Sequence, residues 1–178
     1  INSFSLVAYI PGELGQFLTD LRSELVHGCV AHSHITILPP RPLDLPQDVA
    51  EQILQQEAVR FSPFLVEITD VKVFPESSVI YVDLGRGRDE FLELHRELNV
   101  NDFAQQEKHT YHPHVTLAQG LTAETVPEVL ELAKARWRNA PQHRVMPVQF
   151  LTFLQNTDQN VWLDLAECPL RGSVQKAS

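Results

Sequence analysis

Two short segments of this sequence carry the same residue types in the same order. They are His34-Ile35-Thr36-Ile37 and His114-Val115-Thr116-Leu117, separated by 80 positions (114 − 34). Side chains two residues apart point to the same side of a β-strand, so each histidine shares a face with its threonine while the aliphatic residues enter the core. The pattern therefore predicts two matched pairs of an imidazole and a hydroxyl.

These two pairs suit acid–base catalysis at a phosphate. An imidazole titrates near pH 6.5, roughly, so one ring can accept a proton from water while its charged partner protonates the leaving oxygen. The threonine hydroxyls can donate hydrogen bonds to the non-bridging phosphate oxygens as charge develops there. Such a site needs no metal ion and no cofactor. Because the halves are so alike, the sequence leaves open which histidine is the acid and which the base.

Apolar periodicity predicts strands and helices that position these motifs. Strands are expected at 4–10, 34–38, 64–74, 79–84, 114–118, 145–154 and 161–165, and helices at 14–25, 46–59, 89–98 and 123–137.

A second pair of segments repeats at nearly the same offset as the histidine motifs. Residues 80–84 (IYVDL) match residues 161–165 (VWLDL) at an offset of 81 (164 − 83). Two copies at this long period indicate an internal duplication. We expect one α+β domain over 1–178, built as a bilobal, pseudo-twofold duplication with two small antiparallel sheets flanking a central cleft and helices outside. Its repeats should span about 1–78 and 79–168, followed by a tail at 169–178.

The two motifs, with their spacing and chain length, resemble those of the two-histidine (2H) phosphoesterases, a family that includes 2',3'-cyclic nucleotide phosphodiesterases and bacterial 2'-5' RNA ligases. Pro113, directly before the second His-Val-Thr-Leu run, is typical of these proteins. The resemblance implies a bilobal fold, His34 and His114 as catalytic residues, hydrolysis of a cyclic or 2'-5' phosphodiester, and no cofactor. Many RNA-directed members carry arginine directly after the second motif, whereas this sequence has Gln119. This difference favours a small cyclic phosphate over the joining of RNA ends.

Substrate contacts are expected from Thr36, Thr116, Tyr111 and Arg41. Arg41 follows the first motif after two prolines and can bring positive charge to the cleft. Tyr111 precedes the second motif and can stack on a base or sugar, although an ordinary loop tyrosine is the alternative. For the catalytic histidines the alternative is a purely structural role in their strands.

His32 and His112 turn each motif into His-x-His, so a metal site must be considered. No Asp, Glu or Cys follows within four positions of either motif to complete a ligand set. We therefore expect no metal, with His32 and His112 as neighbours that hydrogen-bond around the site.

Composition limits the partners. The net charge of −9 opposes a clamp on long nucleic acid, but allows a small phosphorylated nucleotide or an RNA end in a local pocket. Cys29 and Cys168 form neither a disulfide framework nor a zinc pattern, which fits a cytoplasmic protein. No apolar stretch suits a membrane span, and residues 1–3 lack the basic start of a secretory signal. We expect a monomeric cyclic phosphodiesterase. A non-catalytic nucleotide-binding module and a 2'-5' RNA ligase are the alternatives.

Overall fold

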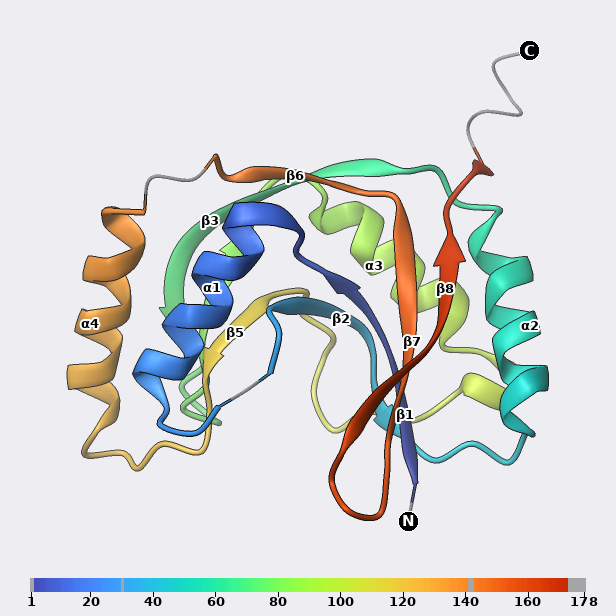
Figure 1. Cartoon of the computed structure of the whole chain (residues 1–178), viewed down its shortest axis with the longest axis horizontal. Helices are drawn as coiled ribbons and strands as arrows, with labels where there is room; N and C mark the ends of the chain where they lie inside the picture. The colour runs from blue at the N-terminus through green and yellow to red at the C-terminus, as the bar shows by residue number, and fades with distance from the viewer. Residues whose placement is uncertain (1, 30, 141–142, 173–178) are drawn as a thin grey trace.

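The computed structural model describes residues 2–29, 31–140 and 143–172, which form eight strands, four α-helices and one short 3₁₀ helix (Figure 1). The elements in chain order are β1 (Ser3–Tyr9), α1 (Gly12–Leu25), β2 (His34–Arg41), α2 (Gln47–Ala58), β3 (Phe64–Val73), β4 (Ile80–Leu84), α3 (Arg88–Leu98), η1 (Asn101–Phe103), β5 (Val115–Ala118), α4 (Val126–Arg138), β6 (Val145–Val148), β7 (Phe150–Asn156) and β8 (Trp162–Pro169).

All eight strands belong to one antiparallel sheet in the order β6-β3-β4-β5-β2-β1-β7-β8. The sheet curves into an arch, with α2 and α4 at opposite ends and α1 and α3 between them (Figure 1). The prediction of a mixed fold of helices and antiparallel strands is confirmed. The prediction of two small sheets is wrong, because β2 and β5 pair with each other and join both halves of the strand set.

The helices cover one face of this sheet. Ile35, Ile37, Val115 and Leu117 are fully buried and form one core cluster with the apolar sides of the helices. We call this side the helix face. His34, Thr36, His114 and Thr116 alternate with those residues and are partly exposed, so they lie on the opposite side, the histidine face.

Strand order in space does not follow the order of the chain. The β2 side of the sheet contains β1, β2, β7 and β8, which come from both ends of the sequence, whereas the β5 side contains β3, β4, β5 and β6. The two segments that repeat at an offset of 81 therefore occupy unlike places: β4 is an inner strand beside β5, and β8 is an edge strand.

The segment 145–154, expected as one strand, is divided into β6 and β7. β6 pairs with β3, whereas β7 pairs with β1 and β8. The chain changes its pairing partners at Gln149, so this segment crosses from one edge of the sheet to the other side.

Close contact between α1 and the end of β1 fixes the start of the first motif. A Cβ atom added at Gly15 would lie 1.7 Å from the Ile10 carbonyl oxygen, so only glycine fits at this position. The Ser33 hydroxyl donates to the Gly15 carbonyl at 2.9 Å, and the Ile10 N–H donates to the Ser33 carbonyl at 3.1 Å. These bonds tie the residue before His34 to both β1 and α1.

Among the described residues, no helix is long and apolar enough to cross a membrane.

Candidate active site

The two motifs lie side by side on β2 and β5. Ile35 pairs with Val115 in antiparallel register, which sets His34 opposite Thr116 and Thr36 opposite His114. The two histidines are then diagonal neighbours on one face, a relationship that separates two residues by roughly 7–8 Å. One tetrahedral anion can lie between their rings.

Both imidazoles are held in the same tautomer. Nδ1 of His34 lies 2.7 Å from the His32 carbonyl oxygen, and Nδ1 of His114 lies 2.6 Å from the His112 carbonyl oxygen. A carbonyl can only accept, so each Nδ1 carries the hydrogen. Nε2 of each neutral ring is therefore left with its lone pair and can accept a proton.

Burial lowers the pKa of both histidines below the ordinary value, because a charged ring loses solvation there. For His34, the nearby positive charges of Arg22 and of a protonated His114 lower the pKa further. For His114, a protonated His112 lowers the pKa further, whereas the Asp83 carboxylate works against burial by favouring the charged ring. The two chemically identical groups therefore differ in the charge that surrounds them.

Asp83 is the centre of a polar cluster beside His114. This carboxylate is 6% exposed and accepts hydrogen bonds from Lys72 Nζ at 2.8 Å, His112 Nε2 at 3.1 Å and the Leu84 N–H at 3.0 Å. Arg88 lies 3.8 Å away. Despite its burial, the cations and hydrogen bonds lower the pKa of Asp83, so it remains a carboxylate near neutral pH.

Aromatic rings surround the histidines. Phe74 and Tyr81 stack with centroids 3.9 Å apart, and the His114 ring meets both of them edge-on at 5.1 and 5.4 Å. On the other side of the site, Tyr9 meets His34 edge-on at 6.3 Å. These contacts restrict the rotation of both imidazoles.

The threonine hydroxyls are available to a ligand. Within the described part of the chain, neither Thr36 nor Thr116 makes a side-chain hydrogen bond, and both are partly exposed on the histidine face. The described residues also contain no group of three or more His, Cys, Asp or Glu side chains placed to hold a metal ion.

A comparison with protein families agrees with this arrangement. The model of the 2'-5' RNA ligase superfamily matches residues 11–159, which include both motifs. The chain belongs to this superfamily. The family resemblance seen in the two motifs is thereby confirmed, since these are the 2H phosphoesterases.

Two curated relatives resemble this chain in sequence. "Putative phosphoesterase BH1439" of Halalkalibacterium halodurans is 27% identical over 138 residues, which is 72% of this chain and 78% of the relative. "Putative phosphoesterase SH1944" of Staphylococcus haemolyticus is 31% identical over 83 residues, 46% of this chain and 48% of the relative.

Several solved structures have a similar fold. LigT of E. coli in its apo form has a TM-score of 0.65 at 13% identity and covers 95% of this chain and 97% of its own. TT0787 of Thermus thermophilus has a TM-score of 0.58 at 18% identity, covering 96% of this chain and 98% of its own. At these identities the likeness concerns the fold.

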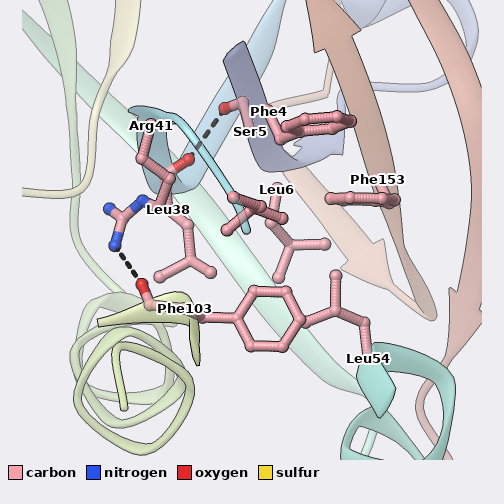
Figure 2. Close-up of a pocket in the computed structure, with 9 residues that line it drawn as sticks. Phe4, Ser5, Leu6, Leu38, Arg41, Leu54, Phe103 and Phe153 are labelled. Carbon is pink, nitrogen blue, oxygen red and sulfur yellow. Dashed lines mark hydrogen bonds between the residues drawn. The ribbon is translucent and has the colours of Figure 1, made fainter. Parts of the chain in front are cut away.

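Arg41 does not reach the histidine face in this member of the superfamily. Its side chain is 2% exposed, and its guanidinium donates to Asn99 Oδ1 at 2.6 Å, the Phe103 carbonyl at 2.7 Å and Glu107 Oε2 at 2.8 Å. Figure 2 shows Arg41 beside Leu38 and the Phe103 carbonyl, on the helix face. The expectation that Arg41 brings positive charge to the substrate is therefore corrected. The hydrogen bonds of its guanidinium link β2 to the segment after α3.

Tyr111 is also placed behind the site. Its hydroxyl donates to the Thr36 carbonyl at 2.8 Å, and its ring stacks on His95 with centroids 4.0 Å apart. Burial and the nearby Glu107 carboxylate raise its pKa. The expectation of base stacking is replaced by a positioning role, since this bond ties the segment before the second motif to the strand of the first.

Two charged residues near the motifs were missed in the sequence. Arg22 is 4% exposed, and its Nε and Nη1 atoms make no hydrogen bond in the described structure. Asp83 lies in a strand whose residues are all buried. A lone charge on an apolar helix side or within a buried strand is rare, and that rarity was the available signal.

Proposed function

We propose that the chain hydrolyses a 2',3'-cyclic phosphate, or a related cyclic phosphodiester, on a small nucleotide or RNA end without a metal ion. The observation that carries the proposal is the pair of diagonal histidines on β2 and β5, each with Nδ1 bound to a backbone carbonyl. Membership of the 2'-5' RNA ligase superfamily supports it. So do the relatives named as phosphoesterases and the LigT structures with phosphate and with 3'-AMP.

In the proposed reaction, His34 and His114 act on opposite sides of the phosphorus. One Nε2 removes a proton from water as the water oxygen bonds to phosphorus. The other, protonated, gives its proton to the ribose oxygen as the P–O ring bond breaks. The hydroxyls of Thr36 and Thr116 donate to the non-bridging oxygens, where negative charge builds up.

The surrounding charges favour one assignment of roles. Arg22 disfavours a proton on His34, whereas Asp83 favours a proton on His114. We therefore assign His34 as the general base and His114 as the general acid. A bound phosphate anion stabilises one protonated imidazole of the two. The Asp83 carboxylate favours His114 as the protonated one.

The proposal includes the internal duplication expected from the sequence. Equal motifs on adjacent central strands support it, as does the order strand, helix, strand, helix in β1-α1-β2-α2 and again in β4-α3-β5-α4.

The test is turnover of 2',3'-cyclic nucleotides in excess chelator by the unaltered chain, by His34→Ala and by His114→Ala. Each variant should lose at least about a hundredfold in kcat, the lower range for one general acid or base. His27→Ala, which removes an exposed histidine after α1, is the matched control and should keep the normal rate. Loss of activity on chelation with recovery on zinc addition would refute the mechanism, as would a near-normal rate in a variant that combines His34→Ala with His114→Ala.

Two other outcomes would replace the proposal. Binding of nucleoside monophosphates without turnover of any cyclic form would indicate a non-catalytic nucleotide-binding module. Salt-sensitive joining of RNA ends would indicate a ligase, which the acidic charge and the exposed Gln119 disfavour.

A further inference from the structure

A polar cavity adjoins the histidine face at the ends of β1 and β2. Its volume is about 290 Å³, close to the lower end of small-molecule pockets, at roughly 300–1,000 Å³. It is lined by Tyr9, Ile10, Gly12, Gly15, Gln16, Thr19, His32, Ser33 and Asp164.

Tyr9 and His32 connect this cavity to the catalytic pair. Tyr9 pairs with His34 in the register of β1 and β2. The Tyr9 ring centroid lies 6.3 Å from that of His34 and 6.4 Å from that of His32. A molecule whose phosphate lies between His34 and His114 can thus extend over Tyr9 into the cavity.

One wall of the cavity presents a hydrogen-bond acceptor, the Asp164 carboxylate. Asp164 Oδ1 accepts a hydrogen bond from the Tyr9 hydroxyl at 2.7 Å, which fixes the carboxylate. Oδ2 of Asp164 has no partner among the described residues, and the lining contains no lysine or arginine. A second phosphate would meet the carboxylate without a fixed cation, whereas an N–H group would meet a charged acceptor.

We propose that this cavity binds the base of the nucleotide substrate and that Asp164 selects a base with adjacent N–H donors, guanine above all. The inference rests on the proposed function, because the phosphate must lie between the two histidines. Guanine presents N1–H and an N2 amino group side by side, which match the two oxygens of one carboxylate. Uracil presents carbonyl oxygens on both sides of its single N–H, and these would face the carboxylate unfavourably.

The test is calorimetric binding of guanosine 3'-monophosphate and uridine 3'-monophosphate to the whole chain. The unaltered protein should bind the guanosine form about tenfold more tightly, the range of one charge-assisted hydrogen bond. In Asp164→Asn the two affinities should agree within about twofold. Glu167→Gln removes an exposed carboxylate from the same strand outside the cavity and should keep the preference.

Equal affinities in the unaltered protein, or a preference that survives Asp164→Asn, would overturn the inference. Should Asp164→Asn fail to fold, Gln16→Trp fills the cavity from α1 and should reduce guanosine 3'-monophosphate affinity to that of inorganic phosphate. Turnover and base preference are separate readouts. A protein that hydrolyses no cyclic nucleotide but still prefers guanine through Asp164 would refute the proposed reaction and retain the base subsite. Equal turnover of cyclic nucleotides with all bases, unaffected by Asp164→Asn, would retain the reaction and refute the subsite.

Discussion

Asp83 Oδ1 lies 3.1 Å from His112 Nε2, while the backbone carbonyl of His112 holds His114 Nδ1 at 2.6 Å. His112 therefore links a buried carboxylate to the His114 imidazole by two contacts, one through its ring and one through its main chain. The first motif differs, because the His32 ring is exposed and meets only Tyr9 among the described aromatic rings. This difference gives the two otherwise similar halves of the site different chemistry.

Asp83→Asn should lower the pKa of His114, because the carboxylate favours the charged ring. If His114 is the general acid, the alkaline limb of the kcat/KM pH profile moves to lower pH, and kcat falls about tenfold at neutral pH. Asp70→Asn, an exposed carboxylate on β3, is the matched control and should leave the limb in place. An acidic limb that moves to lower pH, with the alkaline limb in place, would reverse the assignment of acid and base.

Arg22→Met should act on the other histidine. Removing the guanidinium raises the pKa of His34, so the acidic limb of kcat/KM moves to higher pH. Because Arg22 is buried with Nε and Nη1 unpaired, the same change should raise the free energy of unfolding by about 1 to 3 kcal/mol. Arg96→Met on the exposed side of α3 should do neither. Denaturant unfolding and pH–rate profiles give both readouts, and a destabilised Arg22→Met with an unmoved limb would contradict the account.

The lowered pKa values of His34 and His114 also predict how stability varies with pH. As the pH falls below the unfolded value of about 6.5, the unfolded chain binds protons that the folded chain does not, so the free energy of unfolding falls. Above that pH both states hold neutral rings and this dependence disappears. His34→Asn plus His114→Asn should flatten the change between pH 7.5 and 5.5 in urea unfolding, whereas His27→Asn should leave its slope as it was.

Arg41→Met should affect stability and leave substrate binding alone. The change removes the buried partner of the Phe103 carbonyl and leaves the Glu107 carboxylate with His95 Nε2 as its remaining partner among the described residues, at a cost of about 3 to 5 kcal/mol. The KM of the remaining folded protein should be unchanged, since the side chain lies on the helix face. A raised KM with a normal free energy of unfolding would indicate that Arg41 contacts the substrate.

Local patterns in the sequence predicted the elements but not all their partners. The alternation in His34–Ile37 and His114–Leu117 correctly separated the residues of the core from those of the opposite face, because side-chain direction in a strand is a local property. The pairing of β2 with β5 joins residues 80 positions apart (115 − 35), and no local signal distinguishes two facing sheets from one continuous sheet. The break at Gln149 was missed for the same reason.

Side-chain partners were the least predictable part of the site. Arg41 follows the first motif and looked available for phosphate, yet Asn99 and Glu107, distant in sequence, surround it in the fold. Tyr111 likewise turned toward the Thr36 carbonyl. The position of a residue in the chain shows which motif its side chain lies near, but the contacts of that side chain depend on which other elements pack beside it.

β2 and β5 pair at the centre of the sheet, whereas the cavity is lined in part by exposed residues. Mutations should therefore affect the two motif histidines and the cavity differently. Breaking the Ile35–Val115 pairing requires the two sides of the sheet to separate, so amide hydrogen exchange there should report global unfolding. Asp164 and Gln16 lie on exposed surface of β8 and α1, where replacement leaves that pairing untouched. If the cavity binds the base as proposed, surface mutations around Asp164 should change the base preference while His34 and His114 keep their relative positions.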